Sequence, residues 1–136
     1  MTAVRRALAA LVAAGTVVEV DVDGTRHVVD PAVLDGLADA RRAARAPLLL
    51  PGFDEFVLGY ARRDDVLDPA CFERVVPGGN GMFRATVVDA GRVVAVWKRA
   101  GTPARRTADV EPFGSLSARA ASAVPRLLAR PPWAGT

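Results

Sequence analysis

The N-terminal part of the chain changes from a helical to an extended hydrophobic period. Residues 3–14 repeat apolar side chains at helical spacing, and Gly15 follows where a helix-ending glycine belongs. Residues 17–22 and 26–29 instead belong to β-rich runs with apolar and polar alternation, joined through Asp23-Gly24. Asp-Gly between two such runs is typical of a β-hairpin. The order helix, glycine, hairpin predicts the closing part of a winged-helix domain.

A second helix is predicted to begin at Pro31, because Asp30 can cap it and proline is favoured at the first helical position. Its apolar stripe consists of Val33, Leu34 and Leu37. The alanine- and arginine-rich stretch 38–46 continues this helix into a linker. We therefore predict two units: residues 1–46, the C-terminal part of a winged helix with a linker helix, and residues 47–136, a second domain.

The second unit opens on the apolar run 48–50 and then contains mostly short strands. The predicted strands are 53–60, 82–88, 93–98 and 105–110. A short helix is predicted over 67–76, with Asp68 as its cap, and the glycine-rich stretch 77–81 is predicted to be a turn. A C-terminal helix is expected over 115–129, weakened or kinked by Pro125.

The composition is that of an ordinary globular protein, with 51% apolar and 24% charged residues. Its charge is uneven. Residues 16–39 hold six acids against one arginine, whereas residues 98–130 hold seven bases against two acids. This asymmetry predicts a basic face toward the C-terminus, and the alternative is an ordinary solvated surface.

Several other features narrow the function classes. No apolar run reaches the roughly 20 residues that cross a bilayer, and the single cysteine, Cys71, cannot form an internal disulfide. We therefore expect a cytoplasmic protein. His27 has no second histidine or cysteine nearby, so neither a metal nor another cofactor is expected. Cys71 and Trp97 are interpreted as core residues, and Asp54 as a turn residue that accepts backbone N–H groups rather than a pocket carboxylate.

Residues 48–99 carry a longer pattern. The run Leu-Leu-Leu-Pro-Gly-Phe-Asp-Glu-Phe-Val-Leu-Gly-Tyr at 48–60 is followed by Arg-Arg-Asp-Asp-Val-Leu, by Asn80-Gly81 and by Thr-Val-Val-Asp-Ala-Gly-Arg-Val-Val-Ala-Val-Trp-Lys-Arg at 86–99. This combination resembles the bacterial winged-helix DNA-binding family that contains the AlkZ-like, crosslink-unhooking DNA glycosylases. The positions that match its motifs are Pro51, Phe53, Asp54, Leu58, Gly59, Asn80, Gly81, Arg92, Val93, Val94 and Trp97.

The resemblance implies a fold and a DNA context. In that family the segment forms a β-barrel-like domain after tandem winged helices. We therefore expect an α+β chain, in which a partial winged helix (one helix plus a β-hairpin wing) precedes a small β-barrel-like antiparallel sheet with a C-terminal helix. The turn at 89–92 is one residue longer than the family's usual Asp-Gly-Arg, which leaves its turn type open.

Catalysis is not implied for these residues. In the glycosylases a Gln-x-Gln pair in an earlier winged helix is catalytic, and this sequence contains no glutamine. No catalytic residue is assigned, and the expected partner is double-stranded DNA, contacted through its backbone. The candidate DNA-binding residues are Arg62, Arg63, Arg84, Arg92, Lys98 and Arg99. The alternative is that these bases pair with the acids Asp64, Asp65 and Asp89.

The first hypothesis is a DNA-binding, non-catalytic C-terminal portion or short relative of a winged-helix, glycosylase-type DNA-repair protein, and two further hypotheses stay open beside it. The chain could be a structural or interaction module, either a homodimer that pairs through apolar positions such as Leu8 and Leu11 or a module docked to a missing N-terminal winged-helix partner. An independent enzyme is the third hypothesis, and no residue set supports it.

Overall fold

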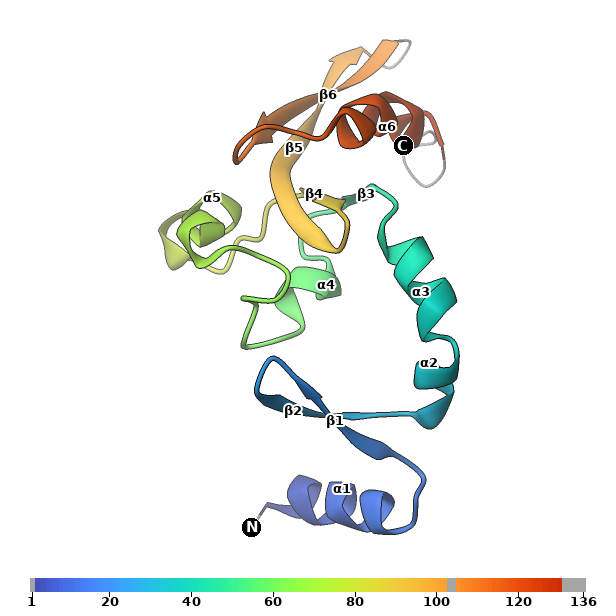
Figure 1. Cartoon of the computed structure of the whole chain (residues 1–136). Helices are drawn as coiled ribbons and strands as arrows, with labels where there is room; N and C mark the ends of the chain where they lie inside the picture. The colour runs from blue at the N-terminus through green and yellow to red at the C-terminus, as the bar shows by residue number, and fades with distance from the viewer. Residues whose placement is uncertain (1, 103–104, 131–136) are drawn as a thin grey trace. The chain divides into compact units, whose positions relative to one another are not determined.

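The computed structural model describes residues 2–102 and 105–130. The chain separates into two compact units, Met1–Ala43 and Ala44–Thr136 (Figure 1). Helix α3, Leu37–Ala44, ends where the two units divide. Each unit has its own architecture.

The first unit begins with helix α1, Ala3–Ala13. Thr2 caps its start, since its hydroxyl accepts the Arg5 N–H. At its end the N–H groups of Gly15 and Thr16 donate to the carbonyls of Val12 and Leu11, and Gly15 has a positive φ of 70°. This pattern is the glycine-terminated motif that satisfies the last helical carbonyls.

The predicted hairpin is confirmed as β1, Val18–Val22, and β2, Thr25–Val29. Asp23 and Gly24 both have positive φ, at 49° and 76°. This two-residue turn matches the right-handed twist of the strands. The single predicted helix after the hairpin is instead two, α2 at Pro31–Asp35 and α3, separated at Gly36.

The second unit is built on a four-stranded antiparallel sheet. The strands are β3 (Leu48–Leu50), β4 (Thr86–Asp89), β5 (Arg92–Thr102) and β6 (Arg105–Pro112), in the order β3-β4-β5-β6. The sheet does not close, so the expected barrel-like form is not what the structure has: β3 and β6 are its two edges. The α+β composition of the chain is as expected.

The predicted strand over 53–60 is wrong. Glu55–Leu58 forms a short helix, α4, because the Asp54 carboxylate accepts the Phe56 N–H at 2.9 Å. Such a cap satisfies a free helical N–H and overrides a weak extended pattern. The structural interpretation of Asp54 is confirmed.

The region 67–81 follows its local signals. A 3-10 turn, η1 at Pro69–Cys71, leads into α5 at Phe72–Val75, and Asp68 caps the turn by accepting the Ala70 N–H. A second 3-10 turn, η2 at Pro77–Gly79, makes the reversal. The following strand is shorter than predicted: β4 begins at Thr86, and before it the Phe83 carbonyl accepts from Phe53 and the Arg84 N–H donates to Val75, neither of which is a strand partner.

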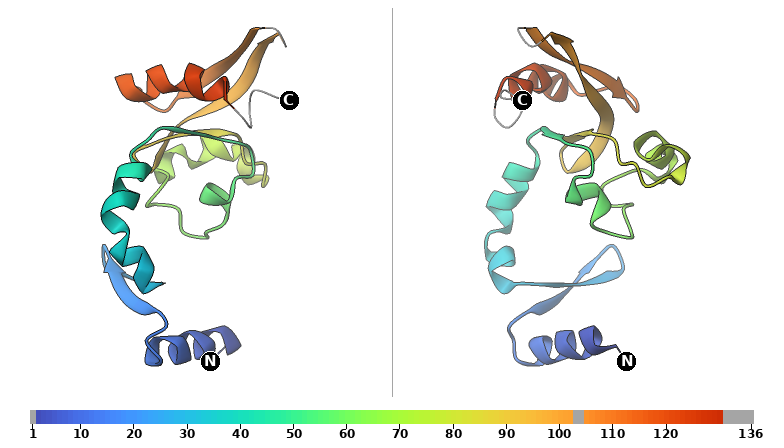
Figure 2. Two further views of the ribbon diagram at one scale, coloured as in Figure 1. Left: turned by 90° about the vertical axis from the view of Figure 1, so that its right-hand side faces the viewer. Right: turned by 180° about the vertical axis from the view of Figure 1, so that it is seen from behind.

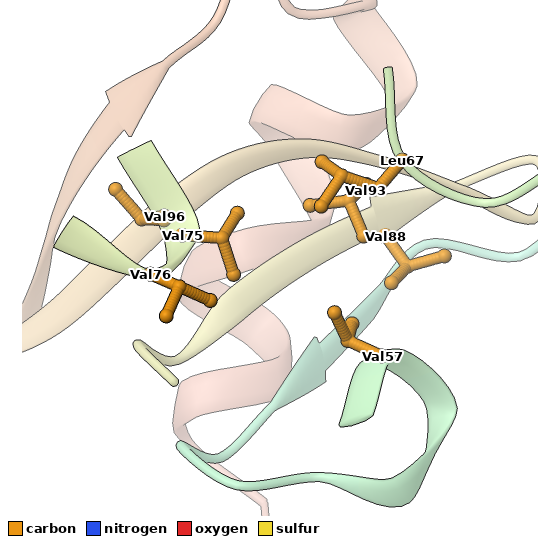
Figure 3. Packing of buried hydrophobic residues seen from close by; sticks show 7 residues of the cluster. All are labelled: Val57, Leu67, Val75, Val76, Val88, Val93 and Val96. Carbon is orange, nitrogen blue, oxygen red and sulfur yellow. The ribbon is translucent and has the colours of Figure 1, made fainter. Parts of the chain in front are cut away.

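Two hydrophobic clusters lie on the two faces of the sheet. On one face the cluster includes the side chains labelled in Figure 3, namely Val57, Leu67, Val75, Val76, Val88, Val93 and Val96. On the other, Val87, Ala95 and Trp97 pack with side chains of α6. Neighbouring residues on a strand point to opposite faces, which explains why Val87 and Val88 belong to different clusters.

Helix α6, Ala118–Leu128, covers the second face of the sheet (Figure 2). Ser117 caps it, and Ala120, Ala123, Val124 and Leu128 are its buried side chains. The predicted helix over 115–129 is therefore present but shorter. It runs through Pro125, which lies on the exposed side of the helix.

Candidate nucleic-acid interface

The six predicted DNA-binding residues lie in the second unit, in three places. Arg62 and Arg63 follow α4, Arg84 and Arg92 lie before β4 and at the start of β5, and Lys98 and Arg99 lie farther along β5. Their surroundings differ greatly. A basic side chain contributes to the electrostatic part of DNA affinity only if it can reach a phosphate, so these surroundings decide which of the six are available.

Arg63 is half-buried and is hydrogen-bonded to the backbone of its own segment. Its Nε donates to the Val57 carbonyl at 2.6 Å, and its terminal nitrogens donate to the carbonyls of Leu58 and Ala61. The guanidinium also lies over the rings of Phe72 and Phe83, 5.8 and 5.4 Å from their centroids. Arg63 therefore fastens the loop that follows α4 to the first hydrophobic cluster.

Arg84 belongs to an ion-pair cluster with Arg74 and Glu111. One Glu111 oxygen accepts from Arg74 at 2.9 Å and the other from Arg84 at 3.2 Å. The hydrogen bonds from Arg74 and then Arg84 hold the pKa of the Glu111 carboxyl below its usual range. Arg74 also stacks 4.6 Å from the centroid of Phe113 and donates to the Pro112 carbonyl.

Arg62 and Arg92 both attach to the segment after α4. Arg62 approaches the Asp65 carboxylate at 3.6 Å, with both side chains half-exposed. Arg92 donates to the carbonyls of Asp64 and Asp65 at 3.5 and 3.1 Å. Each guanidinium is therefore already in contact, through part of its surface, with another residue of this chain.

Beyond the sheet, β5 and β6 continue as a two-stranded ribbon (Figures 1 and 2). Its register places Lys98 opposite Asp109, Arg99 opposite Ala108, Gly101 opposite Arg106, and Thr102 opposite Arg105. We define the ribbon bases as Lys98, Arg99, Arg105 and Arg106. Lys98 and Arg99 are among the residues predicted from the sequence, whereas Arg105 and Arg106 belong to the basic excess after residue 98 but are not among the predicted residues.

The ribbon bases divide between its two faces. Cross-strand partners share a face, and successive residues alternate. Lys98 and Arg105 therefore lie on one face, while Arg99 and Arg106 lie on the other. Of these, Lys98 pairs with Asp109 at 3.1 Å, with both side chains well exposed. An exposed pair of this kind contributes little to the stability of the fold.

A hollow of about 350 Å³ lies beside the base of the ribbon. Arg84 and Lys98 line it together with Asp109 and Glu111. Two bases and two acids leave it without the positive excess that would attract a phosphate. The lining of this hollow therefore does not favour an anion, and the ribbon bases are the remaining candidates for such a contact.

Other candidate chemistry is accounted for. Trp97 is buried in the second cluster, and its Nε1 donates to the Leu50 carbonyl at 3.0 Å, which confirms it as a core residue. Cys71 packs against the first cluster. Across residues 2–102 and 105–130, no three His, Cys, Asp or Glu side chains gather as a metal site. Within the same ranges, no helix is both long and apolar enough to cross a membrane.

Comparison with known proteins places this architecture. The AlkZ-like DNA glycosylase family model matches residues 1–130. The structure is similar to the DNA glycosylase AlkZ of Streptomyces sahachiroi, with a TM-score of 0.73 and 27% sequence identity, over 92% of this chain and 32% of that protein. No curated protein matches the sequence. The chain thus spans about a third of the solved relative. On the family match, which covers nearly its whole length, the chain belongs to the AlkZ-like DNA glycosylase family.

Proposed function

We propose that this chain binds duplex DNA through the β5–β6 ribbon, as a non-catalytic C-terminal portion of an AlkZ-like repair protein. The observation that carries the proposal is the placement of the ribbon bases on both faces of a strand pair that continues beyond the hydrophobic clusters. A two-stranded ribbon fits the major groove of B-DNA. Basic side chains on both faces of the ribbon can reach the phosphates on either side of a groove.

This binding is independent of DNA sequence. Arginine and lysine contacts with phosphates fix position and supply affinity, whereas base identity is read by contacts to base edges. Between the basic residues the ribbon holds Ala100, Gly101, Thr102, Thr107 and Ala108, none of which adds an amide or guanidinium group for reading a base edge, and the arginines are assigned to phosphates. Arg62 and Arg92 are secondary candidates, because they lie outside the ribbon. Arg63 and Arg84 support the fold.

The non-catalytic part rests on the residues present. The family's chemistry needs its paired glutamines, and the chain contains none. We also infer that α1 and the β1–β2 hairpin are the closing helix and wing of a winged helix, within residues 1–46, and that 47–136 is the family's C-terminal domain. A cytoplasmic location and a bacterial source are further predictions that follow from the resemblance to this family.

Titration of a labelled duplex across a salt series tests the proposal. Four phosphate contacts give a slope of log K against log salt of about −3.6. The double variant Arg99→Ala/Arg105→Ala should roughly halve this slope and weaken binding to all sequences equally. Arg41→Ala/Arg42→Ala removes the same charge from the exposed surface of α3 and serves as the matched control.

The two variants separate a local from a general effect. If both weaken binding equally, the attraction comes from net charge and the ribbon has no special role. If the unaltered chain shows no salt-dependent binding at low ionic strength, the DNA proposal fails as a whole, and the alternative of an interaction module takes its place.

A further inference from the structure

The outer edge of β6 has room for a further strand. β6 is the last strand in the order β3-β4-β5-β6, and within residues 2–102 and 105–130 its strand partner is β5 alone. Such an edge presents a row of N–H and C=O groups on which another strand can pair. The other edge strand, β3, has three residues and offers a much shorter row.

The hydrogen bonds of β5 show which backbone groups of β6 face outward. The Trp97 N–H donates to the Ala85 carbonyl, just before β4, so Trp97 and its partner on β6, Val110, are not a hydrogen-bonded pair. Bonded and non-bonded pairs alternate along an antiparallel ladder, which puts Ala108 in the same class as Val110. The N–H and C=O groups of Ala108 and Val110 therefore point away from β5, toward the open edge.

The side chains of β6 change sign along the strand. Arg105 lies at its start, and Asp109 and Glu111 lie near its end. Together with Thr107 they alternate on one face of the strand, and all four residues are exposed. Charges on an edge strand usually discourage pairing. Here, however, a copy that runs antiparallel brings the basic start of one strand to the acidic end of the other.

One register satisfies both the backbone and the charges. Outward-facing residues must oppose each other to exchange hydrogen bonds, and placing Ala108 opposite its own copy achieves this. The same register sets Arg105 opposite Glu111 and Thr107 opposite Asp109. Arg105 of one copy then lies directly across from one acid of the other and diagonal to the second, and both arrangements bring side chains within reach.

Glu111 can accept this additional contact. Each of its oxygens accepts from one arginine of its own chain, Arg74 or Arg84, and an ionised carboxylate has about four acceptor sites. Its side chain is 53% exposed. The intermolecular ion pair therefore leaves the cluster within each chain intact.

We propose that the chain forms a two-fold symmetric dimer, in which two β6 strands pair antiparallel about Ala108 and join the two sheets into one. The occupant of the edge is a second copy because the charge pattern of the strand is complementary to itself. An interface made by residues 105–111 is smaller than that of a stable complex, so the dimer is weak and reversible. Arg105 takes part in both proposals, so dimerisation is measured without DNA, and the failure of one proposal is distinguishable from that of the other.

Sedimentation velocity of the purified chain, from about 10 μM to about 1 mM, should show a monomer–dimer equilibrium. Ala108→Pro removes an outward N–H but no bond to β5, which an edge strand tolerates, and should weaken the dimer about tenfold or more. Arg105→Glu should weaken it similarly, because it sets like charges opposite each other. Arg41→Glu makes the same charge change on the exposed surface of α3 and should leave the dimer unchanged.

Disulfide cross-linking tests the register itself. In a Cys71→Ser background, a mixture of Thr107→Cys chains and Asp109→Cys chains should form a linked dimer on oxidation. Thr107→Cys chains alone should link more slowly, because position 107 lies opposite position 109 of the other copy and not opposite its own equivalent.

Three results would overturn the proposal. The first is the absence of any dimer up to about 1 mM. The second is a dimer that both Ala108→Pro and Arg105→Glu leave intact, which would place the contact on another surface. The third is equal cross-linking in the mixture and in Thr107→Cys alone. Thermal unfolding of each variant verifies that it is folded, and if the proline variant does not fold, Arg105→Glu decides, since that side chain is exposed.

Discussion

Arg74 and Glu111 are 37 positions apart in the sequence, yet the Arg74 Nη2 lies 2.9 Å from a Glu111 carboxylate oxygen. The second oxygen of Glu111 accepts from Arg84. One side chain of β6 thereby joins α5 and the segment before β4, both of which pack near the first hydrophobic cluster.

The ion-pair cluster of Arg74, Arg84 and Glu111 should make the free energy of unfolding depend on pH. The folded-state pKa of Glu111 is lowered, so its contribution is present above the ordinary glutamate value of 4.5 and is lost as pH falls through the lowered folded value. Glu111→Gln should therefore lower the free energy of unfolding at neutral pH. The variant should also lose less of that free energy than the native chain when the pH falls from neutral to acidic. Urea denaturation at several pH values measures both quantities.

The exposed Lys98–Asp109 pair provides the control for this measurement. Asp109→Asn removes a carboxylate from the same strand, but from a well-exposed pair, so it should change stability little. Equal acid dependence in the native chain and in Glu111→Gln would refute a role for the cluster.

A second carboxylate, Asp89, should anchor the C-terminal helix. Asp89 accepts from the Ser117 hydroxyl at 2.7 Å and from Arg119 at 2.8 Å, and its side chain is only 11% exposed. Asp89→Ala should cost about 1–3 kcal/mol, because it removes two hydrogen bonds to a charged carboxylate while their exposed donors can turn to water. Thermal unfolding measures the loss, and amide exchange should show α6 loosened first. A change confined to the β1–β2 hairpin would contradict this assignment.

Thr86 should be a site of easy stabilisation. It is 1% exposed, and its hydroxyl has no hydrogen-bond partner in the described structure. An unsatisfied buried hydroxyl costs about 1–3 kcal/mol, so Thr86→Val, which keeps the shape, should raise stability by about 1 kcal/mol or more. Thr86→Ser keeps the hydroxyl but loses a methyl group, so this variant should be less stable than the native chain. Chemical denaturation distinguishes the two, and a destabilised valine variant would show that the hydroxyl is satisfied.

Gly101 should control the form of the ribbon. Its φ is +82°, and a methyl group at this position would meet the Arg105 carbonyl. Gly101→Ala should therefore distort the ribbon and weaken DNA binding, while the second unit's core, which lies elsewhere, stays folded. Gly114, whose surroundings are open and whose φ is not positive, provides the control as Gly114→Ala. Unchanged DNA affinity in Gly101→Ala would show that DNA binding does not depend on the conformation of the ribbon.

Local signals in the sequence predicted the elements that depend on local chemistry. Asp23-Gly24 specified a hairpin turn because both residues tolerate positive φ, and Asp68 specified a helical start because its carboxylate reaches a nearby N–H. The same rule explains why the predicted strand over 53–60 is wrong: Asp54, predicted to accept backbone N–H groups in a turn, caps a helix over Glu55–Leu58.

Long-range features could not be predicted in this way. Whether a sheet closes depends on how its edges meet, and nothing in the alternation of β3 or β6 specifies that. Arg62 and Arg63 are neighbours of identical chemistry, yet one lies at the surface and the other bonds to three carbonyls, because only packing against Phe72 and Phe83 distinguishes them. Arg105 and Arg106 became candidates only when the register placed them across from β5.

The indole of Trp97 provides an intrinsic optical reporter. It is buried at the sheet, bonded through Nε1 to Leu50, and the chain contains one other tryptophan. With Trp133 replaced by phenylalanine, the emission spectrum would come from this ring alone. Its red shift would then follow loss of the second unit without any attached dye, while changes confined to α1 and its hairpin would leave the spectrum unaltered.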